Sequence, residues 1–391
     1  MNRRTLLRAG IAGAGVMAFA PQPWHRAFAL APPPTAGPGP YGPLQPPLVN
    51  GLRLPAGFTG RIVARGLQPV VGTGAYPPYE WHVFADGGAT FRTDDGGWAY
   101  ASNSETVSGN GGGVSALRFA ANGTVLGAYR ILSGTNINCA GGRTPWRTWL
   151  SCEEHPGGRV YECDPLRPGQ GVIRPALGIF QHEAVCVDPV RRQLYLTEDR
   201  PDSRFYRFTP SNWPDLSAGV LEAASVGPRP QRLVTWVAVD ASVPQSSSNR
   251  PPGTTAFDGG EGCWFSRGVV YFTTKGDFKV HMLDTATSKL RVLYDDDRFT
   301  QRGLTPPLTN VDNVVVARSG DVIVAEDGGD LQLVLITPDR VVAPLLQLVG
   351  HEGSELAGPA FDPSGTRLYV SSQRGGRGPG ITYEVTGPFR R

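Results

Sequence analysis

The segment His182–Glu198 reads HEAVCVDPVRRQLYLTE and contains two short strand-like runs separated by turn-type residues. Valine, leucine, tyrosine and threonine, which are common in strands, fill both runs. Proline and charged residues lie between the runs, as in a turn. The segment therefore predicts an antiparallel β-hairpin.

Similar hairpins recur along the chain. Their second strands are expected at 97–102, 147–152, 193–197, 268–273, 321–325 and 367–371. If Glu105, Glu153, Glu198, Thr274, Glu326 and Ser372 are equivalent strand ends, they are spaced by 48, 45, 76, 52 and 46 residues. A repeat of this length with several strands per unit is typical of a β-propeller. We expect an all-β fold of six blades over residues 49–391; five or seven blades stay open, because the longest step has room for another blade.

The composition agrees with a strand-rich domain. The 391 residues include 51 glycines and 36 prolines, which disfavour long helices. With 40% hydrophobic and 18% charged residues, the chain can bury a core. No apolar run reaches the length of a membrane-spanning helix, so no membrane span is expected.

The first 29 residues are typical of an export signal. Arg3 and Arg4 precede a weakly apolar run, and Ala27-Phe28-Ala29 offers a small-x-small cleavage site. We predict a twin-arginine signal read by the Tat export machinery, with a periplasmic or extracellular destination; an ordinary secretory signal is the alternative. The Pro- and Gly-rich residues 30–48 are expected to be a linker.

The positive formal charge of the chain, +3, comes entirely from this signal. Residues 1–29 contain four arginines and no acid, so the remainder carries a formal charge of −1. A nearly neutral chain argues against nucleic acid as a partner. We expect a monomer.

Acidic residues and one thiol recur where the two strands of a hairpin meet. Antiparallel pairing is expected to place Cys139 beside Glu154, Glu183 beside Glu198, Glu261 beside Thr274 or Lys275, and Asp312 beside Glu326. We call the open end of a hairpin, where its first strand begins and its second strand ends, the mouth of the hairpin. If these strands are the inner strands of their blades, all of the hairpin mouths lie at one rim of the central channel. Crowded carboxylates need protons or cations to neutralise them, so the pattern predicts a metal cluster. Oxygen ligands suit Ca²⁺, and a thiolate among them favours iron.

The five cysteines are an odd number for an exported protein. Cys139 lies in a Gly-rich segment and is expected to bind metal. Cys186 and Cys263 lie in predicted strands and are expected in the core, whereas Cys152 and Cys163 are candidates for a bridge across a short loop.

The segments Asn138–Gly142, Thr144–Trp146 and Trp149–Glu154 together resemble the hallmark region of PhoX-type alkaline phosphatases. The resemblance continues through the segments His182-Glu183, Tyr195–Arg200, Glu261–Trp264, Val270–Lys275, Asp312-Asn313 and Glu326–Gly328. It covers most of residues 50–375. One difference is that Asn103-Ser104-Glu105 stands where family members often have Asn-His-Glu.

The resemblance implies a twin-arginine-exported propeller that hydrolyses small phosphomonoesters with a cluster of Fe³⁺ and Ca²⁺. It implies that Cys139 is an iron ligand and that Glu154 and Glu183 are the strongest carboxylate candidates, and we take these three as the catalytic residues. The further metal candidates are Glu105, Glu153, Glu198, Glu261, Asp312 and Glu326. Such cations lower the pKa of a bound water, which can then act as the nucleophile. The reaction therefore needs no serine nucleophile. Basic residues near the mouths, as candidates for binding the phosphate, are Arg143, Arg200 and Lys275.

Two other functions are compatible with these residues. One is a Ca²⁺-dependent propeller lactonase or esterase, which would contain calcium without iron. The other is a non-catalytic secreted propeller that binds a protein or glycan and uses its carboxylates for structural Ca²⁺.

Overall fold

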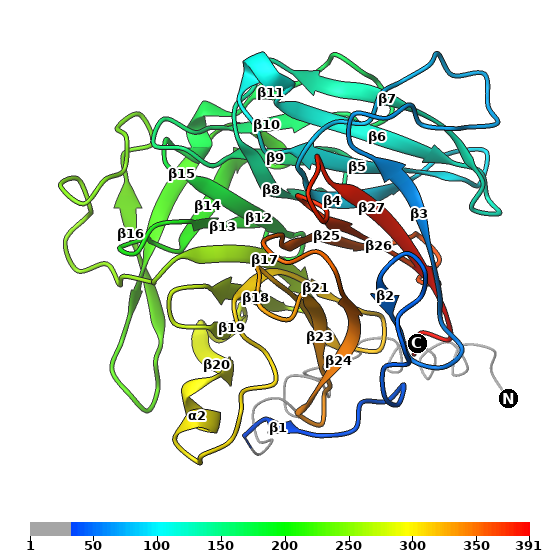
Figure 1. Cartoon of the computed structure of the whole chain (residues 1–391). Coiled ribbons are helices and arrows are strands. Elements are labelled where there is room, and N and C mark those ends of the chain that lie inside the picture. The colour runs from blue at the N-terminus through cyan, green and yellow to red at the C-terminus, as the bar shows by residue number, and fades with distance from the viewer. Residues whose placement is uncertain (1–32) are drawn as a thin grey trace, which may run out of the picture.

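The computed structural model describes residues 33–391, which form six β-sheets arranged as the blades of a propeller (Figure 1). The six-bladed prediction is therefore confirmed. The export signal predicted over residues 1–29 lies outside the described residues. Within residues 33–391, no helix combines the length and the hydropathy needed to cross a membrane.

The first four blades follow one another in the chain. Blade one consists of β4 (Ala85–Arg92), β5 (Trp98–Ser104), β6 (Gly113–Phe119) and β7 (Val125–Ser133). Blade two consists of β8 (Asn138–Arg143), β9 (Trp149–Glu153), β10 (Val160–Cys163) and β11 (Val172–Ile173). Blade three consists of β12 (His182–Asp188), β13 (Gln193–Glu198), β14 (Tyr206–Asn212), β15 (Asp215–Val226) and β16 (Val234–Val239). Blade four consists of β17 (Gly260–Ser266), β18 (Val269–Thr274), β19 (Lys279–Asp284) and β20 (Lys289–Asp295).

The last two blades also take strands from the N-terminal part of the chain. Blade five consists of β21 (Val311–Val316), β22 (Val322–Glu326), β23 (Gln332–Ile336) and β24 (Val341–Leu348), with β1 (Thr35–Ala36) and β2 (Leu52–Arg53) paired to β24. Blade six consists of β25 (Leu356–Phe361), β26 (Arg367–Ser372), β27 (Ile381–Thr386) and β3 (Thr59–Arg65). The short helices are η1 (Ser108–Asn110), η2 (Pro175–Leu177) and α2 (Asp297–Thr300).

Strand pairing between the two ends of the chain closes the ring. In blade six, β3 from the N-terminal part runs antiparallel to β27 from the C-terminal part, with Thr59 opposite Thr386. This pairing covers a sheet edge that would otherwise be exposed. The segment expected to be a linker, residues 30–48, is described from residue 33 onward, and there β1 pairs in parallel with β24 of blade five.

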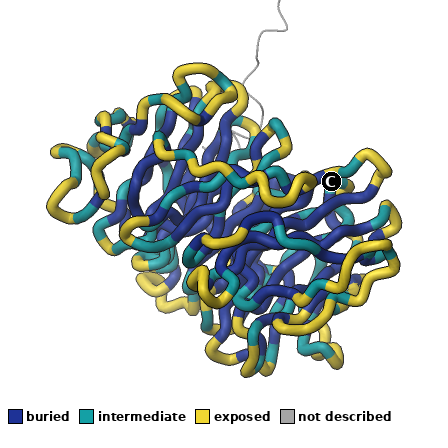
Figure 2. Tube along the Cα trace, turned by 90° about the horizontal axis from the view of Figure 1, so that it is seen from above, coloured by how far each residue is buried: buried dark blue, intermediate teal, exposed yellow. Residues whose placement is uncertain are grey.

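The long step between blades three and four is explained by an extra strand and a loop. The fifth strand of blade three, β16, ends at Val239, and the chain then runs through a loop to β17. No seventh blade is inserted among the described residues. Burial follows the strands, and exposed residues gather in the connecting loops (Figure 2).

The first strand of every blade lies on the inside of the ring. These strands, β4, β8, β12, β17, β21 and β25, each pack against the first strand of the next blade (Figure 1). Each one also has a β-bulge shortly after it starts. In blade two, for example, Asn138 pairs with Glu153, but the next pair is Gly141 with Ser151, which leaves Cys139 and Ala140 unpaired. A bulge bends the strand and redirects a side chain.

Small residues in the bulges let neighbouring inner strands approach closely. A Cβ atom added to Gly87 of β4 would lie 2.4 Å from the Cα atom of Ala140 in β8. One added to Gly262 of β17 would lie 2.5 Å from the backbone nitrogen of Val314 in β21. Backbone atoms on both sides leave little room to relax, so both positions require glycine for packing reasons.

We expect Gly87→Ala to destabilise the protein by about 1–3 kcal/mol, because the added methyl group overlaps the backbone of blade two. The measurement is the free energy of unfolding in urea of metal-free protein. Gly109→Ala is the matched control, since a Cβ atom there meets nothing within 4 Å. Equal stability of the two variants would contradict the close packing of the bulges.

Candidate metal centre

Five bulges place one potential metal ligand each at equivalent positions of blades one to five. The equivalence follows from the register, in which Ala85, Asn138, His182, Gly260 and Val311 are the last paired residues before each bulge. The residues that follow them are Asp86, Cys139, Glu183, Glu261 and Asp312. All five are buried. Blade six has Ala357 at this position, and Glu355 lies two residues earlier.

A second set of side chains comes from the residue that follows the second strand of each blade. Ser104, Glu153, Glu198, Thr274, Glu326 and Ser372 are the last paired residues of these strands. The residues one position further on are Glu105, Glu154, Asp199, Lys275, Asp327 and Gln373. Four of these six are acids, so blades one, two, three and five each offer two potential ligands.

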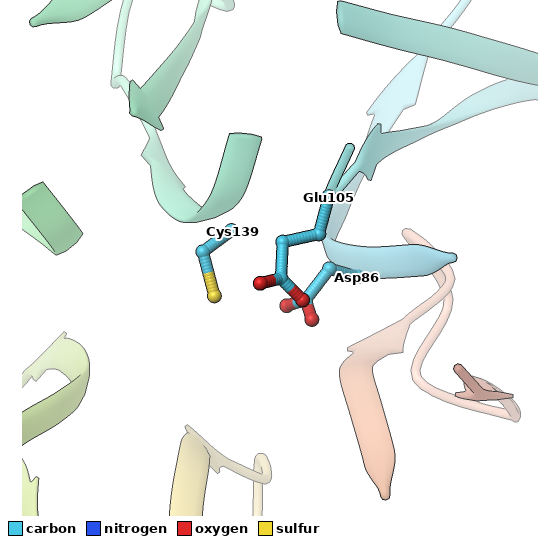
Figure 3. A group of neighbouring side chains, drawn as sticks. All are labelled: Asp86, Glu105 and Cys139. Carbon is cyan, nitrogen blue, oxygen red and sulfur yellow. The ribbon is translucent and has the colours of Figure 1, made fainter. Parts of the chain in front are cut away.

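The ligand atoms form three overlapping groups, within each of which they lie no more than 4.8 Å apart. The groups are Asp86 with Glu105 and Cys139, Cys139 with Glu154 and Glu183, and Glu183 with Glu261 and Asp312. Figure 3 shows the first group, in which the carboxylates of Asp86 and Glu105 lie beside the sulfur of Cys139. Because Cys139 and Glu183 each belong to two groups, the three groups form one continuous cluster of seven residues.

Hydrogen bonds between blades hold the backbone of this cluster. Asn103 of blade one donates to the carbonyl of Cys139 in blade two over 3.0 Å. Thr197 of blade three donates to the carbonyl of Glu261 in blade four over 2.5 Å, and Thr273 of blade four donates to that of Asp312 in blade five over 2.5 Å. Asn103, Thr197 and Thr273 all precede the last paired residue of their strand. One blade therefore positions the ligand of the next.

Burial and mutual repulsion raise the pKa values of the acids. Burial first, and then repulsion from other carboxylates, raises the pKa of Asp86 to about 8, that of Glu154 to about 9 and that of Glu261 to about 8. The pKa values of Glu183 and Asp312 are raised well above the ordinary range for the same two reasons. Each of these groups therefore favours its protonated form unless a positive charge lies beside it.

The cluster fits metal ions because one carboxylate in it has no protein partner. The side chain of Glu183 is 0% exposed, and neither of its oxygens has a hydrogen-bond partner. A fully buried carboxyl without partners carries a large desolvation penalty, which a coordinated cation would offset. Cys139 supplies a soft ligand among hard oxygens, and burial, followed by repulsion from Asp86, raises the pKa of its thiol. A transition metal would displace that proton.

Two basic side chains contact the acids at the edge of the cluster. The Nζ atom of Lys275 lies 2.6 Å from Asp199 and 2.7 Å from Glu261. Arg374 lies 3.2 Å from Glu355, whose pKa is raised to about 10 mainly by burial. Lys275 is therefore the one predicted phosphate-binding residue that lies at the cluster within the described chain.

The other two basic candidates lie away from the cluster or have a partner. Arg143 ends β8, at the opposite end of the strand from Cys139. It is exposed and lines cavities of about 160 and 290 Å³ together with Trp264. Arg200 contacts Asp202 over 3.3 Å.

The structure does not bring Glu153, Glu198 and Glu326 into the three groups. Glu153 accepts hydrogen bonds from the backbone nitrogens of Asn136 and Arg159, and Glu326 accepts them from those of Thr309 and Gln332. Glu198 forms an ion pair with Arg250 at 2.7 Å.

The reason is an offset of one residue in the predicted equivalence. Glu105 corresponds to Glu154 and Asp199, whereas Glu153 and Glu198 correspond to Ser104. Successive side chains of a strand point to opposite sides, so the offset reverses the direction of each carboxylate.

The residues that the sequence prediction missed are Asp86, Asp199, Asp327, Glu355 and Arg374. Asp86 could have been found from the sequence, because Ala85–Arg92 pairs with the strand predicted at 97–102. Asp86 lies at the position in this strand that Cys139 has in blade two. Asp199 and Asp327 follow directly after Glu198 and Glu326, so the same offset hid them. Glu355 precedes its bulge, and no repeat position marks it.

The fold and the site define a six-bladed β-propeller with an axial cluster of carboxylates and one thiol of the kind that binds metal ions. A family model described as alkaline phosphatase PhoX matches residues 79–159 and 155–292, which is more than half of the chain. The chain therefore belongs to the PhoX alkaline phosphatase family, and the resemblance drawn from the sequence motifs is confirmed.

Solved structures share this fold. Pseudomonas fluorescens PhoX, in complex with vanadate, a transition state analogue, has a TM-score of 0.72 at 16% identity, covering 91% of this chain and 97% of that chain. XC5397 from Xanthomonas campestris, a gluconolactonase, has a TM-score of 0.50 at 15% identity, covering 90% and 99%. A Bacteroides thetaiotaomicron protein of unknown function has a TM-score of 0.51 at 9% identity, covering 84% and 76%. No curated protein matches the chain significantly.

We expect the metal-free protein to lose stability as pH rises from about 4.5 to about 9. The acids have raised pKa values when folded, so in this range the folded state binds more protons than the unfolded state, and raising the pH favours unfolding. The measurement is the Tm of chelator-treated protein against pH, which should fall by several degrees. Added Ca²⁺ and iron should flatten the curve, because bound cations replace the protons. A Tm that rises across this window would contradict the raised pKa values.

Proposed function

We propose that the chain is an exported phosphomonoesterase whose axial cluster binds iron and calcium. The observation that carries this proposal is the continuity of the three ligand groups, joined through the thiol of Cys139 and the unpartnered carboxylate of Glu183. Membership of the PhoX family supports phosphatase activity.

The donor set suggests a division of the cluster between metals. Cys139 joins the two groups that also contain Asp86, Glu105, Glu154 and Glu183, so iron would be held there. The group of Glu183, Glu261 and Asp312 has oxygen ligands alone, which suits Ca²⁺. Bound cations would supply Lewis-acid stabilisation of the phosphoryl oxygens and would lower the pKa of a water.

The side chains of this chain have their own part in the reaction. A phosphomonoester dianion is repelled by a ring of carboxylates, so phosphate binding requires that the ring be neutralised first. Lys275 and Arg374 bring positive charge to the edge of the ring and are the residues that we assign to attracting the phosphate. The hydrogen bond from Asn103 keeps the bulge of Cys139 in place.

The thiol distinguishes this proposal from the calcium-dependent lactonase. A calcium lactonase or a structural calcium site has no need of a buried thiol shared by two ligand groups. The likeness to the gluconolactonase XC5397 is one of fold.

Glu153 and Glu154 provide a sharp test, because they are adjacent and only one of them belongs to the cluster. We expect Glu154→Gln to lower kcat/KM for an aryl phosphate by about 100-fold or more through loss of a metal ligand. Glu153→Gln should keep activity within about twofold, because Glu153 belongs to none of the three ligand groups. Its amide oxygen can replace only one of the two carboxylate oxygens that accept from Asn136 and Arg159, so a small loss of stability is expected. The metal content of both variants should be measured beside activity. If the two variants lose activity equally, or if neither does, the assignment of the cluster is wrong.

We also propose that residues 1–29 are a twin-arginine signal, that residues 30–48 connect it to the propeller, and that residues 49–391 form the catalytic domain. The protein would then act as a monomer in the periplasm or outside the cell. Substituting Arg3 and Arg4 together by lysine should leave an uncleaved precursor inside the cell, because this export route requires the arginine pair. Fractionation and N-terminal sequencing measure this; a mature protein that still begins at Leu30 would contradict the twin-arginine route.

A further inference from the structure

Two cysteines that lie far apart in the sequence contact each other at the junction of blades three and four. The Sγ atom of Cys263 in β17 lies 3.2 Å from that of Cys186 in β12, and 77 residues separate them in the chain. Each side chain is 5% exposed. Both were expected to be ordinary core residues, but core packing alone does not require two sulfur atoms to face each other across a blade junction.

The surrounding structure holds the two thiols in this position. Cys186 pairs with Tyr195 in the sheet of blade three, and Cys263 pairs with Phe272 in that of blade four. The Sγ atom of Cys263 also lies 3.6 Å from the carbonyl of Tyr195. Next to them the rings of Phe205 and Phe272 stack across the same junction with centroids 4.1 Å apart. The contact is therefore built into a rigid interface.

The pair borders a cavity on one side. Cys186 and Cys263 both line a cavity of about 290 Å³, together with Arg143 and Trp264. This cavity lies toward the end of the inner strands away from the metal ligands, since Arg143 is the last residue of β8 and Cys139 is near its start. This cavity is therefore the side from which an oxidant would approach the buried pair, and it lies away from the axial cluster.

We propose that Cys186 and Cys263 are a modification site that forms a disulfide and links blades three and four. The oxidant is a disulfide, either a small one such as oxidised glutathione or that of an oxidoreductase. The thiolate of Cys263 attacks this disulfide, which releases one reduced thiol and leaves a mixed disulfide on Cys263. The thiolate of Cys186 then attacks the sulfur of Cys263 and expels the second thiol. Two protein thiols are oxidised, one disulfide is reduced to two thiols, and both protons go to the released thiols.

The position of the disulfide suits it to stabilising the ring of blades. The ring is closed by β3 and β27 in blade six, and the junction of blades three and four lies on the other side of the ring. A disulfide there would close a loop of 77 residues and so lower the conformational entropy of the unfolded chain. In the folded state it would hold blades three and four together, opposite the place where β3 and β27 close the ring. This inference does not depend on the proposed function, because it involves none of the metal ligands.

The test uses the full chain incubated with oxidised glutathione, then unfolded and treated with an alkylating reagent. The reduced protein has five free cysteines. We expect the number of alkylated cysteines to fall by two, the protein mass to drop by ~2 Da, and a peptide containing Cys186 to be linked to one containing Cys263. The Tm should rise by roughly 5 °C and return to its starting value with a reductant.

Matched variants make the result specific. Cys186→Ala should abolish both the link and the oxidation-dependent rise in Tm, whereas Cys163→Ala should keep both, because Cys163 lies in blade two in a different core cluster. The wild-type mass measurement stands even if a variant folds poorly. Five alkylated cysteines after oxidation, a persistent glutathione adduct, or a link from Cys263 to Cys152 would each overturn the proposal.

Discussion

Repulsion among buried carboxylates at the axis is the constraint on which the rest of the structure depends. Seven potential ligands from five blades form three overlapping groups, in each of which the ligand atoms lie within 4.8 Å of one another. Glu183 among them has no hydrogen-bond partner for either oxygen. A core that served stability alone would not collect such groups, because each acid pays a desolvation penalty. The propeller tolerates them because its six sheets fix the backbone around the axis, so the side chains cannot move apart.

The β-bulge is the local device that makes this arrangement possible. In each of the first five blades it places one ligand directly after the last residue that is paired before the bulge. In blades one, two and four the small residues Gly87, Ala140 and Gly262 beside the ligand let neighbouring inner strands approach closely. The hydrogen bonds from Asn103, Thr197 and Thr273 then couple neighbouring blades at their ligand positions. The positions of the metal-ligand side chains therefore depend on how neighbouring blades pack, and a change in the packing of the blades should move the ligands.

The sequence was sufficient for the fold and for much of the site, and the reasons for its failures are physical. Strand propensity and repeated turns predicted six hairpins. The recurrence of acids and one cysteine at the open ends of these hairpins predicted that Cys139, Glu183, Glu261 and Asp312 lie at a common rim. The second strands of blades two and three end in two consecutive acids, whereas that of blade one ends in Ser104-Glu105, so Glu153 and Glu198 were aligned with Glu105 in place of Ser104. The contact between Cys186 and Cys263 depends on how two blades meet, which no local pattern records.

The central claim is that the bulge residues converge on one shared set of cations. The most direct measurement is anomalous diffraction at the iron edge from crystals of the exported protein, together with its elemental analysis. We predict iron bound to the sulfur of Cys139 and further cations in contact with Glu183, with Glu153, Glu198 and Glu326 free of metal. Cations bound elsewhere, or Glu183 and Cys139 without any bound ion, would contradict the account.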